Sequence, residues 1–349
     1  MKTRVYITVD VECREERKIG DKVQPFAGYD LRMWGRFSNQ PKDLGIGLIM
    51  RELDRFGFKA TFYVDPFGSV FFGADGLAEV CREIRGRGHD TQLHTHPIQR
   101  VADWITENRQ APSDRMADYS AAEQLALFKE GIDLLVDAGI PRDEIVSFRA
   151  GHFAANNDSW TAMAKAGIKI GSNLNPCFDR PGHCRIRWPG PASALFDTEQ
   201  GVWELPVTNF EDGQGRHRLL QITAISLQEM KDLLLQSSQL GYPEVTIVTH
   251  SFEFFHIDSE AQKTGRPNTI NLRRIRGLAE FLDAHRDKFE VEPVSALAAR
   301  LPMPLTQLDR AMPKGKPSLR AARFFWQALK RIEAKAPQME RLSRKLIAP

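Results

Sequence analysis

The sequence has few cysteines and no long apolar run. Its four cysteines, Cys13, Cys81, Cys177 and Cys184, are too scattered over 349 residues to form a disulfide framework, so we expect reduced thiols. No segment approaches the roughly 18 apolar residues of a membrane-spanning helix. The first residues, MKTRVYITVD, lack the apolar core of a signal peptide. We therefore predict a cytoplasmic protein.

The chain also lacks a strong net charge. Its 48 lysines and arginines nearly balance 45 acidic residues, which leaves a formal charge of +3. No global field points to nucleic acid, and we predict no nucleic-acid partner. An apolar content of 42% is that of a globular protein with a substantial core. The oligomeric state stays open.

Apolar, β-branched segments alternate with helical patterns along the first 300 residues. Strands are predicted at 4–10, 59–65 and 244–250, and each ends in a polar residue. Helices are predicted at 44–57, 120–139 and 226–241, the last two opened by Ser-x-x-Glu capping boxes. Shorter strand candidates bring the count to at least six strand and helix units. This alternation favours a parallel α/β architecture.

The predicted domain is a closed or nearly closed (β/α) barrel over residues 1–300. Polar residues cluster at the strand ends, where barrel enzymes keep their chemistry. An open doubly wound sheet is the alternative. Residues 301–349 form a second region, a basic and partly amphipathic helical extension. We expect residues 317–349 to pack against the barrel, with binding to a membrane surface as the alternative.

Two short stretches place acids and histidines in register. In the strand that ends with ITVDVE, a period of two puts Asp10 and Glu12 on one side. In LHTHP the same alternation lets His94 and His96 share a face, and two neutral imidazoles suit a metal such as zinc. Pro97 cannot donate a hydrogen bond to a sheet, so the strand is expected to end there.

Two further strands end in basic residues. SFRAGHF supplies Arg149, and VTHSFEFF supplies His250. Together with the acids and the histidine pair, they form the inventory of metal-assisted hydrolysis: ligands, a base for water, and an acid for the leaving group. His152 and Phe153 follow Arg149, and we expect them to contact substrate, with completion of a metal shell as the alternative for His152.

The order of these motifs resembles a known family. TVDVE, KATFYVD, GHDTQLHTHP, FRAGHF, WELPV and IVTHSFE follow one another as in the polysaccharide deacetylases with a NodB homology domain, carbohydrate esterase family 4. The resemblance covers roughly residues 4–295. It implies a deformed (β/α) barrel that removes N- or O-acetyl groups from sugars with a divalent metal. Zinc is the first expectation, with cobalt, manganese or nickel as alternatives.

The resemblance also implies roles for particular residues. Asp10 matches the catalytic base, Arg149 the arginine that orients it, and His250 the catalytic acid. His94 matches the first metal histidine. The segment Trp203, Leu205 and Pro206 resembles the one that lines the acyl pocket.

Three positions depart from the family pattern. Val11 stands where the second of two adjacent aspartates is usual, so Glu12 becomes the expected metal carboxylate. The usual second histidine would fall at Ile98, so His96 is the expected replacement. Gly151 replaces the usual proline of the third motif.

The sequence therefore predicts a metal-dependent sugar deacetylase with a metal-activated water, an aspartate base and a histidine acid. Expected substrates are glycans or lipid- or nucleotide-linked intermediates, and a glycolipid partner would place the enzyme peripherally at the inner membrane surface. The alternatives are an amidohydrolase that acts on a small non-sugar amide and an inactive glycan-binding homologue.

Overall fold

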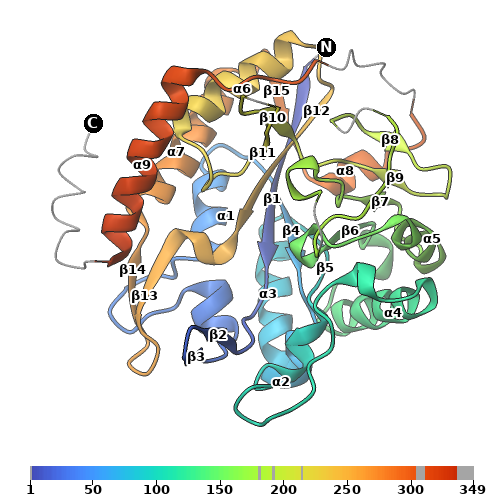
Figure 1. Cartoon of the computed structure of the whole chain (residues 1–349), viewed down its shortest axis with the longest axis vertical. Helices are drawn as coiled ribbons and strands as arrows, with labels where there is room; N and C mark the ends of the chain where they lie inside the picture. Colours follow the sequence, from blue (N-terminus) through green and yellow to red (C-terminus); the bar gives the residue numbers. More distant parts are fainter. Residues whose placement is uncertain (1, 180–181, 191–192, 214, 304–310, 336–349) are drawn as a thin grey trace.

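The computed structural model describes residues 2–179, 182–190, 193–213, 215–303 and 311–335. Figure 1 shows a sheet at the centre of the molecule with helices around it. The strands are β1 Thr3–Val11, β2 Arg17–Ile19, β3 Lys22–Gln24, β4 Thr61–Val64, β5 Asp90–Thr95, β6 Ser147–Ala150, β7 Ile170–Gly171, β8 Phe196–Asp197, β9 Trp203–Glu204, β10 Asn209–Glu211, β11 His217–Leu219, β12 Glu244–His250, β13 Phe255–Ser259, β14 Thr264–Pro267 and β15 Phe289–Val291. The α-helices are α1 Ile46–Asp54, α2 Gly68–Phe72, α3 Ala74–Gly86, α4 Ala121–Asp137, α5 Asn157–Ala166, α6 Leu227–Gln239, α7 Thr269–Ala284, α8 Val294–Ala298 and α9 Pro317–Lys335.

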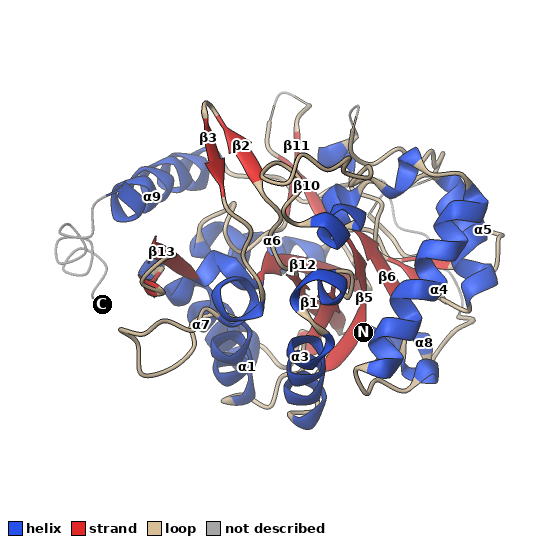
Figure 2. Ribbon diagram, turned by 90° about the horizontal axis from the view of Figure 1, so that it is seen from below, coloured by secondary structure: helices blue, strands red, loops and turns tan. Residues whose placement is uncertain are grey.

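The main sheet is a curled half-barrel of parallel strands with one antiparallel edge. Its order is β12-β1-β4-β5-β6-β7-β9-β8, and β15 pairs with the start of β1. Among the described strands of this main sheet, only β8 runs antiparallel to its neighbour, β9. Helices surround this sheet, as Figure 2 shows from below. The predicted deformed (β/α) barrel is confirmed, and the doubly wound alternative is not what the chain adopts.

An irregular segment bridges the two sides of the half-barrel. The backbone N–H of Leu205 donates to Gly171 of β7, and that of Val207 donates to Leu174. Farther along, the N–H of Ile222 donates to Val248 of β12. The chain from β9 to residue 222 therefore spans the gap between β7 and β12, where the ladder of regular strands ends.

Side-chain alternation along β1 separates an apolar outer face from a polar inner one. Val5, Ile7, Val9 and Val11 are buried in the main hydrophobic core, which the surrounding helices complete. Thr8 and Asp10 instead point to the inner face, where both accept hydrogen bonds from Arg149. The inside of this barrel is thus a hydrogen-bonded polar network near its carboxyl end.

The two predicted capping boxes are observed, and the segment after β1 forms local structure of its own. Ser120 and Ser226 each accept a hydrogen bond from the N3 backbone of their helix and form the expected capping boxes. The stretch 13–42, between β1 and α1, contains the β2–β3 hairpin and a π-helical turn at Asp30–Trp34. All four cysteines are free thiols.

Helix α9 packs on the barrel through charged side chains. The buried guanidinium of Arg323 donates two 2.8 Å hydrogen bonds to Asp212 and lies 3.2 Å from Glu229 of α6. Glu333, also buried, accepts hydrogen bonds from Thr269 at the start of α7. Two large apolar side chains of this helix, Phe325 and Ile332, are instead exposed. The division of the chain at residue 300 stays a prediction, and residues 336–349 of the extension lie outside the described part.

No helix among the described residues combines the length and apolar character needed to cross a membrane.

Candidate metal and catalytic site

The predicted residues meet at the carboxyl end of the parallel strands. On β1, Asp10 lies opposite His250 of β12, and His94 of β5 lies opposite Arg149 of β6. Because parallel strands all end at the same rim, their last side chains converge. A cavity of about 270 Å³ opens there. Its lining includes Asp10, Glu12, Arg17, Arg32, His94, His96, His152, Phe153 and His250.

The carboxylate of Asp10 is held by a fully buried arginine. Arg149 Nη1 donates to Asp10 Oδ1 at 2.7 Å and to Thr8 Oγ1 at 2.9 Å. Its other nitrogens donate to the carbonyl and the hydroxyl of Ser172, and its guanidinium lies 4.3 Å from the ring centre of Tyr63. All three nitrogens of the guanidinium donate hydrogen bonds, so Asp10 is presented to the cavity in one orientation.

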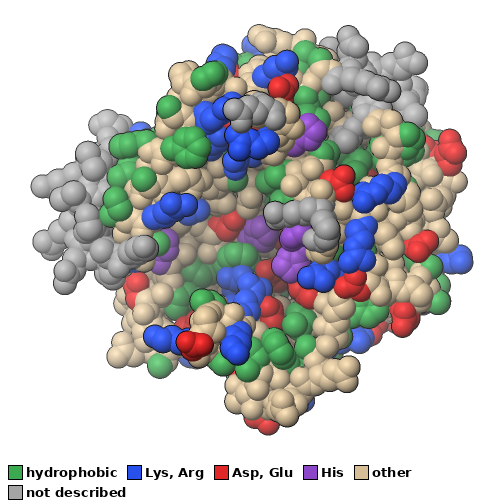
Figure 3. Space-filling model, in the orientation of Figure 1, with side chains coloured by type: hydrophobic (Ala, Val, Ile, Leu, Met, Phe, Trp, Pro, Cys, Tyr) green, Lys and Arg blue, Asp and Glu red, His purple; other side chains and the backbone are tan. Residues whose placement is uncertain are grey.

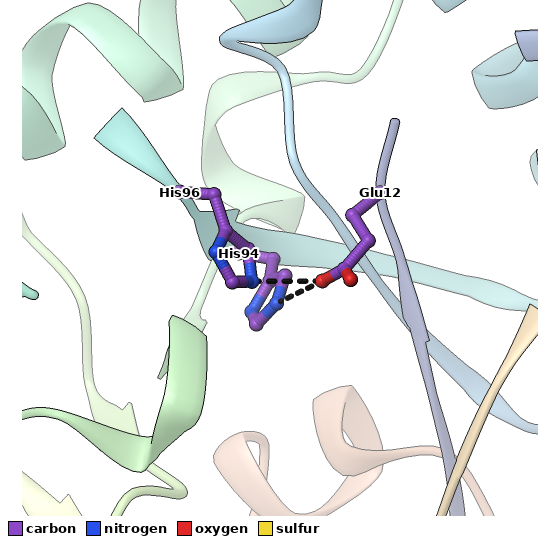
Figure 4. Close-up of side chains that lie close together, drawn as sticks. All are labelled: Glu12, His94 and His96. Atoms are coloured by element: carbon purple, nitrogen blue, oxygen red, sulfur yellow. Dashed lines mark ion pairs between the residues drawn. The ribbon is translucent and has the colours of Figure 1, made fainter. Parts of the chain in front are cut away.

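Glu12, His94 and His96 form a compact buried cluster beside this pair. Glu12 Oε2 lies 2.7 Å from His96 Nε2 and 3.4 Å from His94 Nε2 (Figure 4). Their potential ligand atoms all lie within 4.8 Å of one another. One carboxylate and two imidazoles are a common ligand set of catalytic zinc.

The tautomer of His94 supports metal binding. His94 Nδ1 lies 2.7 Å from the carbonyl oxygen of Arg149, which only accepts hydrogen bonds, so this nitrogen carries the proton. In a neutral ring Nε2 then presents a lone pair toward the carboxylate of Glu12. Two buried acceptors that face each other are stabilised by a cation between them, and these residues therefore fit a divalent metal.

His96 is oriented by a residue that the sequence motifs do not contain. Its Nδ1 lies 2.9 Å from Oδ2 of Asp114, and the same oxygen lies 3.0 Å from Nε2 of His152. An Asp–His pair of this kind fixes the ring that ligates a metal. Asp114 comes from the irregular segment 102–120, whose sequence has no periodicity that would reveal it.

The charges of this cluster depend on one another. Burial raises the pKa of Glu12, but His96 and His94 outweigh it and hold this pKa well below its usual range. Burial lowers the pKa of His96, but the carboxylates of Asp114 and Glu12 outweigh it and hold this pKa well above its usual range. Without a cation, the 2.7 Å contact is therefore a charged hydrogen bond, and a bound metal would take the place of its proton.

Two of the departures from the family pattern are physically coupled. Strand β5 ends at Thr95, as Pro97 predicted, so His96 leaves the sheet and its ring turns toward Gly151. A Cβ added at Gly151 would lie 2.5 Å from His96 Cε1, closer than atoms approach without displacement. The histidine at position 96 therefore requires glycine at position 151. Immediately after it, His152 and Phe153 both have positive φ, a strained conformation that recurs at functional sites.

His250 sits between two carboxylates on the other side of the cavity. Its Nε2 lies 3.9 Å from Asp10 Oδ2, and its Nδ1 lies 3.4 Å from Glu253 Oε1. Burial lowers the pKa of His250, but Glu253 and Asp10 outweigh it and raise this pKa to about 9. The pKa of Glu253 falls to about 2, because His250 and hydrogen bonds from Thr223 and Thr249 outweigh its burial. His250 is thus a cation at neutral pH.

The structure does not bring the expected acyl-pocket segment to this cavity. Trp203 and Leu205 belong to a second apolar cluster that includes Tyr6 and Val294. Pro206, the next residue in the sequence, is also buried. None of the three is in the lining of the cavity over the described residues. His152 and Phe153 do line it, as expected. Arg17 and Arg32, which no motif indicated, complete the wall.

No family model and no curated protein matches the sequence. Among solved structures, a protein from Mycobacterium smegmatis with the provisional name polysaccharide deacetylase aligns with a TM-score of 0.51 at 17% identity, covering 88% of this chain and 94% of that chain.

The chain shares its fold with this protein.

Two further solved structures match with lower scores. A family 4 carbohydrate esterase from Streptomyces lividans, solved with acetate, has a TM-score of 0.40 at 13% identity, with 82% of this chain and 90% of that chain covered. A 4-alpha-glucanotransferase from Thermococcus litoralis has a TM-score of 0.49 at 12% identity, with 88% and 41% covered.

We predict that Gly151→Ala weakens metal binding with little effect on folding. The new methyl group displaces the His96 ring from Glu12, and losing the orientation of one ligand costs about 10- to 100-fold in affinity. Zinc titration by calorimetry measures this change. Gly86→Ala is the matched control, because a Cβ there meets nothing within 4 Å. Equal zinc affinity in both variants would contradict the coupling of positions 96 and 151.

We predict that Glu253→Gln moves the alkaline limb of the pH–rate profile to lower pH. Glu253 raises the pKa of His250, so neutralising it lowers this pKa from about 9 by about one pH unit or more. An acid must be protonated to act, so activity is then lost at lower pH. The measurement is kcat/KM against pH, with exposed Glu280→Gln as control. If the alkaline limb of the profile does not move, Glu253 does not set the pKa of His250.

Proposed function

We propose that this protein is a metal-dependent hydrolase that removes an acetyl group from an acetylated sugar. One observation carries the proposal: a fixed carboxylate, a Glu-His-His cluster and a cationic histidine face a single cavity. These are a base, a metal-binding set and an acid, which together suffice for hydrolysis of an amide or an ester.

Glu12, His94 and His96 would hold the divalent cation, with zinc as the first choice and cobalt, manganese or nickel as alternatives. When bound, such a cation supplies a Lewis acid that polarises the acyl carbonyl and acidifies the attacking water. Asp10 accepts the proton that this water loses, and Arg149 keeps its carboxylate aimed at the cavity through the 2.7 Å hydrogen bond. Because Arg149 is fully buried and does not line the cavity, it acts through Asp10 and does not reach substrate.

His250 then donates a proton to the leaving amine or hydroxyl of the sugar as the C–N or C–O bond breaks. Its raised pKa keeps it protonated at neutral pH, which suits an acid better than a base. Its side chain is 25% exposed and lies across the cavity from the metal cluster, so a substrate between them reaches both. The products are acetate and the deacetylated sugar.

The fold supports a sugar substrate, since the name of the Mycobacterium smegmatis protein refers to polysaccharide deacetylation. Trp203, Leu205 and Pro206 remain a predicted acyl-pocket segment, although they lie away from the cavity. The cytoplasmic location likewise stays a prediction.

We predict that Asp10→Asn abolishes acetate release but keeps the metal. The variants Glu12→Gln, His94→Ala and His96→Ala each lose the bound metal. Loss of a general base costs about 100- to 10,000-fold in rate. Acetate release from N-acetylglucosamine oligomers and metal content are measured on each variant, with exposed Asp143→Asn as control. Near-normal activity of Asp10→Asn would overturn the base assignment. A wild type with neither metal nor acetate release would overturn the function.

We also propose that α9 rests on a phospholipid membrane surface. Its inner face is anchored by Arg323 and Glu333, whereas Phe324 and Phe325 are 64% and 58% exposed. Ile332 and the exposed Arg331 lie about two turns farther along the same side. Exposed aromatic rings beside a cation are typical of helices that lie in the membrane interface.

We predict that the double variant Phe324→Ser and Phe325→Ser loses vesicle binding. Removing two aromatic side chains takes away most of the apolar area that would enter the interface. Sedimentation with phosphatidylglycerol–phosphatidylcholine vesicles measures the bound fraction. Val70→Ser is the control, because Val70 is 58% exposed on α2, away from α9. Unchanged binding of the double variant would count against a membrane role for α9.

A further inference from the structure

Arg32 is a mostly buried cation in the wall of the cavity. It lies in the π-helical turn Asp30–Trp34, its side chain is 11% exposed, and it lines the cavity. Among the described residues, none accepts a hydrogen bond from its guanidinium, and its Nε is buried without a partner. Its guanidinium carbon lies 3.1 Å from the ring centre of Phe252, which fixes the plane of the fork.

The carboxylate nearest to Arg32 is already committed. Glu12 Oε1 lies 3.7 Å from Arg32 Nη2, too far for a hydrogen bond, while its Oε2 faces both metal histidines. Asp10, the other acid of the wall, is bonded to Arg149. Arg32 is therefore ion-paired with Glu12 but hydrogen-bonded to no acid of the cavity lining, which leaves its N–H groups for another acceptor.

A second arginine reaches the same wall from the β2–β3 hairpin. Arg17 is bonded on one side to Glu15, with Nε 2.5 Å from Oε1, and its side chain is 39% exposed. The remaining edge of this guanidinium is open to the cavity that it lines. Figure 3 shows histidine side chains in a central hollow of this face, with basic side chains around it.

We propose that Arg32 and Arg17 bind an anionic group of the substrate, so that the preferred substrate is an acetylated saccharide carrying a phosphate or a carboxylate. A guanidinium fork matches either group with two parallel hydrogen bonds. The contact of Arg32 with the ring of Phe252 preorganises one fork, and the more exposed Arg17 closes the other side. This inference rests on the proposed function and specifies its substrate class.

The test compares matched neutral and anionic sugars. Binding of N-acetylglucosamine, N-acetylglucosamine 1-phosphate and N-acetylmuramic acid is measured by calorimetry on metal-loaded Asp10→Asn protein, in which no turnover interferes. We expect at least one anionic sugar to bind about tenfold or more tightly than the neutral one. Comparing the phosphorylated sugar with the carboxylated sugar shows which anionic group the site prefers.

Arginine variants in the same background decide the assignment. Arg32→Gln should lower affinity for the anionic sugar about 10- to 100-fold, and Arg17→Gln about two- to fivefold, with little change for the neutral sugar. Arg142→Gln, at an exposed site outside the cavity, is the control. Metal content is measured alongside, because Arg32 lies near Glu12. Arg17 touches no metal-binding residue and keeps the test valid if Arg32→Gln loses metal.

Equal binding of neutral and anionic sugars, or a preference that survives both arginine variants, would overturn the proposal. A fall in affinity for all sugars alike would also overturn it, since Arg32 would then only support Glu12. Acetate release by the wild type is measured separately. If no sugar is deacetylated, the proposed function fails, whereas the binding data still judge the anion site.

Discussion

The site depends on the burial of many charges at one end of a barrel. Asp10, Glu12, His96 and Arg149 are each at most 5% exposed. An isolated charge in such a place is so costly that each must be paired or neutralised. The pairing is met here by contacts between residues in or just after different strands, so the charges link the carboxyl ends of β1, β5 and β6. Removing one partner of such a pair costs about 3–5 kcal/mol, because the other is left buried and alone.

The parts of the site that could be predicted from the sequence are those that follow from periodicity. A period of two put Asp10 and Glu12 on the same side of β1, and parallel strands brought His94 and Arg149 to the same rim. The end of β5 was also predictable, because a proline cannot donate to a sheet. These inferences need only the local geometry of a strand and the common direction of neighbouring strands.

The remaining residues were not predictable, because they come from segments without a repeat. Asp114 and Arg32 reach the site from segments whose path is set by tertiary packing.

The packing of helix α9 was also not predictable from its sequence. Its amphipathic pattern identified an apolar side but not what covers it, and the side that packs carries Arg323 and Glu333 instead. The Trp203 segment matched a motif, yet its short strand directs it into another apolar cluster.

Arg149 contacts the two halves of the site through different parts of itself. Its guanidinium holds Asp10, and its backbone carbonyl accepts from His94. The spacing between the Asp10 carboxylate and the His94 ring is therefore linked through the covalent bonds of one residue, which are stiffer than any packing contact. The two contacts are also separable, because a change of side chain at this position leaves the carbonyl in place. The histidine can thus keep its tautomer in a protein whose base has lost its support.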